Sequence, residues 1–75
     1  MEITVKCFAS LGAYQPVNGD SFPVQDGNTV QDLLNRLGLN LEEVKLVFVN
    51  GEKAPLTLRL NQGDRVGLFP AVGGG

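Results

Sequence analysis

The sequence contains no histidine, no tryptophan and a single cysteine among its 75 residues. With Cys7 alone, no disulfide can form within the chain, and a structural zinc site would lack the ligands it needs. The absence of histidine also excludes Ser-His-Asp and Cys-His catalytic arrangements within this chain. One cysteine suits a reducing compartment, so we expect a cytoplasmic protein.

Long apolar runs and an excess of basic charge are also missing. No stretch approaches the length of a membrane span, and residues 1–5 show neither the basic nor the apolar region of a signal peptide. The formal net charge of −2 argues against nucleic acid as a partner and is compatible with a basic protein partner. The hydrophobic content of 43% is ordinary for a folded domain, so we expect one small domain.

Two strands are predicted before residue 26. Residues 2–8 alternate, with Cys7 on the inward face and Phe8 as the apolar exception on the outward face. Residues 9–20 are rich in turn formers and predict a long hairpin loop. Residues 21–25 predict a second, short strand, and a proline within it is typical of a sheet edge.

A short helix is predicted next. The apolar residues follow helical spacing, which places them on one face: Val30, Leu33, Leu34 and Leu37. Asn28 or Thr29 can act as N-cap, and the pairing of Asn28 with Gln31 resembles a capping box. Gly38 stands where a helix-ending glycine belongs. So short a helix does not persist alone in water, so it must lie on a sheet.

The second half of the chain predicts a hairpin and a last strand. Residues 45–50 form an apolar strand, and Asn50-Gly51 favours a type I′ turn. Residues 56–60 are compatible with strand or irregular structure. The last strand is predicted over 65–69, and we expect Pro70 to stop its pairing. One helix covers only one face of a sheet, so the other face either meets a partner or is left as an apolar patch.

These elements predict an α+β fold with a mixed sheet of four to five strands and one main helix on one face. We divide the chain into a domain over 1–69 and a flexible tail over 70–75. The first and last strands are expected side by side in parallel, which brings Phe8 near Phe69 on the face away from the helix. Either Val47 and Val49 or Leu46 and Phe48 join them. We assign Phe8, Phe69 and Val47 to a partner-binding surface.

The sequence ends in Gly73-Gly74-Gly75. Glycine has no side chain, so such a tail can thread a narrow channel in a partner and present its terminal carboxylate there. A frayed terminus or an expression linker is the alternative.

The order of elements resembles the β-grasp fold of ubiquitin, and several segments resemble the MoaD/ThiS family of sulfur carriers. The matching segments are Phe8-Ala9, Thr29 to Leu34, Val49-Asn50-Gly51, Gly63 to Val66 and Leu68 to Gly75. The tail is most similar to that of MoaD, the small subunit of molybdopterin synthase. Ala71 departs from a common family proline, and Gly73 from a common small residue.

The resemblance implies carrier chemistry at Gly75. An E1-like adenylating enzyme of the MoeB/ThiF type would activate the Gly75 carboxylate with ATP, and a sulfur donor protein would convert it to a thiocarboxylate. The tail would then enter a large synthase subunit of the MoaE type, where its sulfur builds molybdopterin for a molybdenum or tungsten cofactor. No bound cofactor or metal is expected in the chain itself, and it would not be catalytic alone.

Further roles follow from the same resemblance. Gly74 would give clearance next to the reactive carbon, Gly73 would add flexibility, and Pro70 and Val72 would shape the tail. Cys7 could serve a persulfide relay, but its inward position favours a buried core thiol.

Other functions remain open from the sequence. The carrier could supply thiazole and thiamine synthesis or tRNA thiolation. A ubiquitin-like modifier joined to lysines through Gly75 and a plain interaction module are further alternatives.

Overall fold

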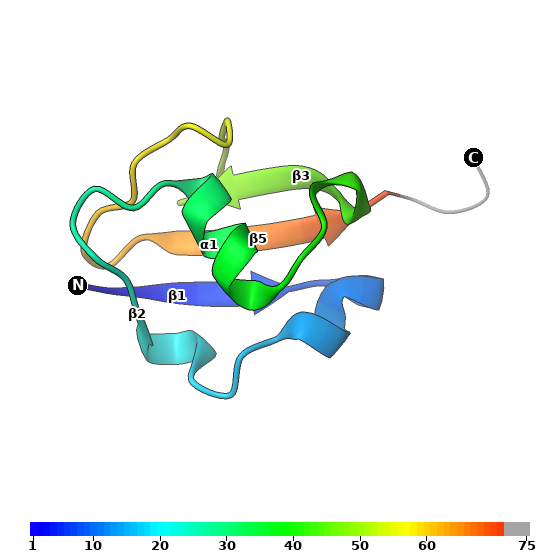
Figure 1. The fold of residues 1–75 in the computed structure, drawn as a ribbon, viewed down its shortest axis with the longest axis horizontal. Coiled ribbons are helices and arrows are strands. Elements are labelled where there is room, and N and C mark those ends of the chain that lie inside the picture. Colours follow the sequence, from blue (N-terminus) through cyan, green and yellow to red (C-terminus); the bar gives the residue numbers. More distant parts are fainter. Residues whose placement is uncertain (72–75) are drawn as a thin grey trace.

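The structure, a computed structural model, describes residues 1–71 (Figure 1). Its strands are β1 (Glu2–Cys7), β2 (Phe22–Pro23), β3 (Val44–Val49), β4 (Glu52–Lys53) and β5 (Arg65–Pro70). Its helices are α1 (Val30–Leu37) and the 3-10 helices η1 (Ala9–Tyr14), η2 (Gly19–Ser21) and η3 (Leu41–Glu43). Within the described range, no helix has the length and apolar character needed to cross a membrane.

The five strands form one mixed sheet in the order β2-β1-β5-β3-β4. β1 and β5 are the parallel pair at its centre, and the other pairs are antiparallel. This confirms the predicted α+β, β-grasp fold with one main helix. β2 lies at the edge, as its proline predicted.

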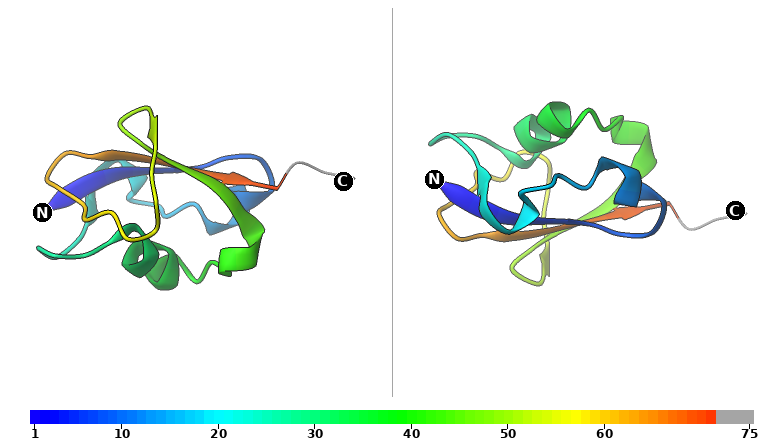
Figure 2. Two further views of the ribbon diagram at one scale, coloured as in Figure 1. Left: turned by 90° about the horizontal axis from the view of Figure 1, so that it is seen from above. Right: turned by 90° about the horizontal axis from the view of Figure 1, so that it is seen from below.

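The core lies between α1 and the inner face of the sheet, and no helix of residues 1–71 lies on the opposite face (Figure 2). Alternation along β1 and β5 and helical spacing along α1 point their apolar side chains into the same layer. The side chains that are at most 2% exposed include Ile3, Val5, Leu11, Val30, Leu33, Leu34, Leu60, Val66 and Leu68. A helix of eight residues is therefore held by packing rather than by its own stability.

Of the two predicted N-caps, α1 uses Thr29, but its capping box differs from the predicted one. Thr29 is the N-cap: its hydroxyl accepts from the Asp32 N–H, and the Asp32 carboxylate accepts from the Thr29 N–H at 2.9 Å. The expected Asn28–Gln31 pairing is wrong, because the Asn28 side chain accepts from the Gln25 N–H instead. Gly38, at φ 76°, ends the helix as predicted.

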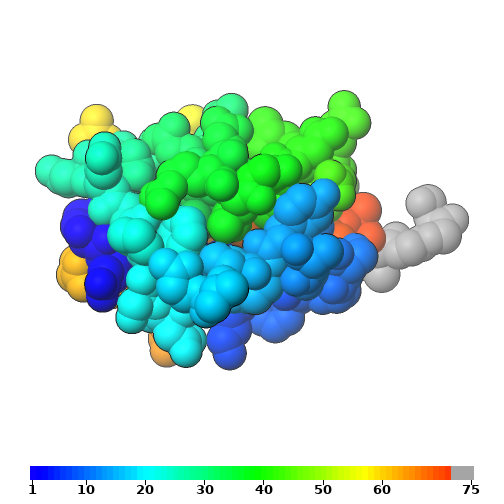
Figure 3. All heavy atoms as spheres, turned by 60° about the horizontal axis from the view of Figure 1, so that its bottom comes forward, coloured from blue at the N-terminus to red at the C-terminus, as the bar shows by residue number. Residues whose placement is uncertain are grey.

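Residues 9–20 are more ordered than the predicted loop, because η1 and most of η2 lie within them. Figure 3 shows this stretch, blue to cyan, bordering the helix-side segment in green. Leu11 anchors it in the core. The Gln15 amide binds the edge of β1 beyond β2: it accepts from the Cys7 N–H at 2.7 Å and donates to the Val5 carbonyl at 2.9 Å. It therefore substitutes for a neighbouring strand.

The predicted hairpin is confirmed, since Asn50 (φ 54°) and Gly51 (φ 83°) both take the left-handed values of a type I′ turn. Residues 56–60 are irregular apart from a single bridge between Thr29 and Arg59. β5 continues through Pro70, which lies opposite Val44. The expectation that pairing stops before Pro70 is wrong, because proline lacks only the N–H donor and can still occupy a terminal register position.

Candidate partner-binding face

Three phenylalanines meet on the sheet face that lacks a helix. Phe8 follows β1, and its ring stacks on that of Phe69 in β5, with ring centroids 4.4 Å apart and planes at 2°. The ring of Phe48, from β3, meets Phe69 edge-on at 5.5 Å. The parallel pairing of β1 with β5 produces this contact, as the sequence predicted. The result is a continuous aromatic cluster, and Phe8 within it is 40% exposed.

Val47 does not belong to this cluster, contrary to our assignment. It lies opposite Leu68 on the core side of the sheet and is 6% exposed. Phe48 and Leu46, the other pair that the sequence left open, are half-buried and lie opposite Gly67 and Phe69. Residues directly opposite in an antiparallel pair share a face, so β3 contributes Leu46 and Phe48 to the open side.

Gly67 lies beneath the aromatic cluster, and the sequence alone did not mark it as a site residue. A Cβ added there would lie 3.4 Å from ring carbons of Phe8 and Phe69, so the missing side chain leaves room beside both rings. A shallow hollow of about 410 Å³ opens at this place, and the turn between β3 and β4 contributes Gly51 to its wall. A glycine inside an alternating strand is the signal that could have indicated this close approach.

Basic side chains border the hollow. Lys6 and Arg65, both exposed, line it together with Thr4. Lys6 lies opposite Gly67, and Arg65 lies opposite Thr4, in the pairing of β1 with β5. The candidate face therefore combines an aromatic centre with positive charge along its side.

The described chain leaves the sheet beside this cluster. β5 carries Phe69 and Pro70 to the end of the sheet opposite the N-terminus, and Ala71 follows (Figure 1). The tail residues Val72, Gly73, Gly74 and Gly75 lie outside the described residues, so their predicted roles stay predictions. The division between 1–69 and 70–75 also stays a prediction.

Cys7 lies on the inner side at the end of β1 and is half-buried against the core. Burial raises the pKa of the Cys7 thiol, because desolvation disfavours the thiolate. The thiolate is the nucleophilic form, so this position suits a packing thiol better than a sulfur relay.

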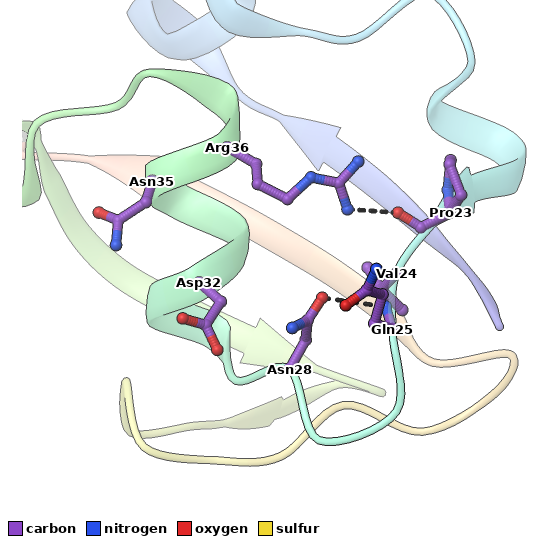
Figure 4. A pocket seen from close by; sticks show the side chains of 7 residues that line it. All are labelled: Pro23, Val24, Gln25, Asn28, Asp32, Asn35 and Arg36. Atoms are coloured by element: carbon purple, nitrogen blue, oxygen red, sulfur yellow. Dashed lines mark hydrogen bonds between the residues drawn. The ribbon is translucent and has the colours of Figure 1, made fainter.

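A polar hollow of about 600 Å³ lies between α1 and the β2–α1 loop (Figure 4). Arg36 crosses it, donating to the Pro23 carbonyl, and its guanidinium stands 4.6 Å from the Phe22 ring centroid. The Asn28 side chain is bonded to Gln25. These contacts hold the loop to the helix. Within residues 1–71, no cluster of three or more His, Cys, Asp or Glu residues could hold a metal ion.

Comparisons with known proteins give one family and one structural neighbour. The model of the ThiS family matches residues 5–75. A crystal structure of small archaeal modifier protein 1 (SAMP1) from Haloferax volcanii is 28% identical, covers 100% of both chains and has a TM-score of 0.73. A second crystal structure of the H. volcanii small archaeal modifier protein 1 is 27% identical, with 95% of this chain and 98% of that chain covered and a TM-score of 0.67. No curated protein sequence matches.

Proposed function

Because this chain belongs to the ThiS family of ubiquitin-like proteins, we propose that it is a sulfur carrier whose reactive group is the Gly75 carboxylate. The observation that carries the proposal is the extent of the family match, which runs through the terminal Gly74-Gly75. Proteins of this family generally work with E1-like activating enzymes. We take such an enzyme as the first partner.

The proposed chemistry begins with activation of a poor electrophile. A carboxylate oxygen of Gly75 attacks the α-phosphorus of ATP bound to the partner enzyme, and pyrophosphate leaves. A sulfur nucleophile from the donor protein then attacks the carbonyl carbon of the acyl-adenylate, and AMP leaves. That sulfur is the outer sulfur of a persulfide on the donor protein, so the product is an acyl disulfide. A second thiol of the donor protein attacks the donor's inner sulfur and forms a disulfide with it. The outer sulfur leaves with the electron pair of the broken S–S bond and becomes the thiocarboxylate of Gly75. ATP is therefore a substrate of the partner rather than a cofactor of this chain.

The open sheet face supports a docked carrier. Phe8 and Phe69 lie where the chain leaves the sheet, so a partner that covers them also receives the tail. Five extended residues after β5, from Ala71 onward, reach roughly 17 Å, which is enough to enter a buried site. The ring of Pro70 and the branched side chain of Val72 restrict the backbone beside them. The tail therefore loses less conformational entropy when it threads into the partner.

The acceptor that we propose is the pterin precursor of molybdopterin, with a MoaE-type large subunit as the second partner. Its support is the similarity of Phe69-Pro70-Ala71-Val72-Gly73-Gly74-Gly75 to the MoaD tail. Thiazole synthesis and tRNA thiolation use the same activated terminus, so they are the alternatives within the carrier class.

A second candidate function is protein modification. The full-length match to proteins named small archaeal modifier protein 1 favours it. A lysine amine of a target would attack the same activated Gly75 carbon and form an isopeptide bond. The two functions share the activation of Gly75 and differ in the nucleophile that then attacks its carbonyl carbon.

The experiment is intact-mass analysis after incubation with ATP, the E1-like enzyme and the sulfur donor of the same cell. A mass gain that matches the exchange of one oxygen for sulfur, located in the C-terminal peptide, supports the carrier function. Isopeptide adducts through Gly75 support the modifier. A chain lacking Gly74 and Gly75 is the control and should show neither product. An unchanged mass with a competent enzyme would contradict the carrier function and favour the modifier, for which isopeptide adducts are then sought in cell extract.

A further inference from the structure

The two faces of this protein differ in net charge. Its formal net charge is −2. Five of the eight acidic residues lie, exposed, on η2, the turn before α1, α1 itself and η3, away from the open face: Asp20, Asp26, Asp32, Glu42 and Glu43. The open face is different, because Lys6 and Arg65 border its aromatic hollow.

The remaining charges near the sheet do not reverse this pattern. Lys53 lies opposite Phe48, so it shares the open face. Glu52 lies opposite Val49, on the core side, and Asp64 is buried. Glu2 shares the side of Lys6 but begins the strand, at the end remote from Phe8. The local charge around the aromatic cluster is therefore positive in a protein that is negative overall.

From this difference we propose that the open face binds a partner surface on which acidic side chains surround an apolar side chain seated over Gly67. The proposal rests on the carrier function and names the chemistry of its docking partner. It reverses the sequence expectation of a basic partner, because net charge says nothing about where the charges lie. Complementary charge steers encounter and fixes orientation.

The same charges disfavour a second copy of this chain as the occupant. Two open faces brought together would place the positive charge of one copy against that of the other, and like charges in contact raise the free energy of association. The hollow over Gly67 also offers a concave centre, whereas the copy would offer another hollow. An acidic partner with a projecting apolar side chain fits both features.

The test is ATP-dependent activation of the full chain by its E1-like enzyme, followed as pyrophosphate release at several salt concentrations. Lys6→Glu and Arg65→Glu should each raise the KM for this chain about tenfold and leave kcat nearly unchanged, because steering is lost while the tail is intact. Arg59→Glu is the matched control, since it changes the charge equally from a segment held against the start of α1. Its KM should stay near that of the wild type.

A second pair of variants tests the hollow. Gly67→Ala places a methyl group in ordinary contact with the rings, so folding should be retained while the KM rises several-fold. Gly12→Ala is the control, because a Cβ there meets nothing within 4 Å. Thermal unfolding of every variant separates a docking defect from a folding defect.

The outcomes separate the two proposals. Normal wild-type turnover with equal KM values in the Lys6, Arg65 and Arg59 variants would overturn the acidic partner and leave the carrier function standing. An unchanged KM in Gly67→Ala would overturn the apolar contact. A wild-type chain that is never activated would contradict the carrier function itself, and this proposal would fail with it.

Discussion

The ring of Phe8 lies flat against the ring of Phe69, with centroids 4.4 Å apart. Phe8 is the residue after β1, and Phe69 is the next-to-last residue of β5. The stack thus ties the end of the first strand to the start of the tail. It also forms part of the face that we expect partners to bind, so stability and docking depend on the same rings.

A double-mutant cycle on Phe8→Ala and Phe69→Ala should show a coupling free energy of about 0.5–1.5 kcal/mol in urea unfolding. The reason is that a close aromatic pair contributes beyond the burial of each ring. Phe8 with Val17 is the control pair, because Val17 is fully exposed, and its cycle should be additive. Additivity in both cycles would show that the stack contributes no coupling.

The Gln15 amide completes the edge of β1 by bonding Cys7 and Val5. Gln15→Ala should lower the free energy of unfolding by about 1–2 kcal/mol, because it removes two hydrogen bonds from the strand. Gly19→Ala should disturb the same contact, since its Cβ would collide with Gln15 Nε2 and lie 2.8 Å from the Val5 oxygen. Urea unfolding measures both variants.

Gln31→Ala is the control for the Gln15 variant. Gln31 is exposed on α1, and alanine is the better helix former, so its free energy of unfolding should not fall. A similar loss in both variants would show that the Gln15 contact is dispensable. An unbonded strand edge can also pair with another chain, so gel filtration of Gln15→Ala should show more self-association than that of the wild type.

Most of the fold could be predicted because its patterns are local. Alternation in 2–8 predicted which side chains of β1 face the core, and helical spacing from Val30 to Leu37 predicted the same for α1. Asn50-Gly51 predicted the turn. The parallel pair followed from topology. The 3-10 helices in 9–20 could not be predicted, because nothing in this stretch distinguishes Leu11, which reaches the core, from Val17, which is fully exposed.

The candidate site could be predicted only in part. Phe8 and Phe69 were placed correctly, since both break the pattern of their strand faces. The placement of Val47 on the partner-binding face was wrong. Residues 46–49 are apolar at every position, so the sequence does not show which of them face the core. The register with β5 decides it, by placing Val47 opposite Leu68 and Phe48 opposite Gly67. The capping box of α1 was predicted on the wrong pair, Asn28 with Gln31, because the competing bond of Asn28 to Gln25 depends on the loop.

Asn50 and Asp64 join the β3–β4 turn to the start of β5. The Asn50 amide donates to the Asp64 carboxylate at 2.9 Å and accepts from the Arg65 N–H at 2.9 Å, and Asp64 also accepts from the Asn61 N–H. Asn50→Gly should lower the free energy of unfolding by about 1–3 kcal/mol, because it keeps the positive φ and loses the side-chain bonds. Asn50→Ala should cost a further ~1 kcal/mol for the left-handed backbone. Equal unfolding midpoints for these two variants in urea would contradict the backbone contribution.

Cys7 gives the last prediction, a dependence of stability on pH. Burial raises the pKa of the Cys7 thiol in the folded chain, whereas an unfolded cysteine has a pKa of about 8.5. Above the unfolded pKa, the unfolded chain releases its proton while the folded chain keeps it. The unfolded state then binds fewer protons, so the free energy of unfolding falls as pH rises between the two pKa values. Below the unfolded pKa, both states hold the proton and Cys7 adds no slope.

Urea unfolding of the wild type and of Cys7→Ala at a series of alkaline pH values isolates this effect. Every contribution that the two proteins share cancels in the difference between their curves. Loss of the sulfur lowers the stability of the variant by an amount that does not change with pH, so the curves should converge as pH rises. Curves that stay parallel would show that the folded thiol ionises as readily as the unfolded one, which would remove the physical basis for treating Cys7 as a packing residue.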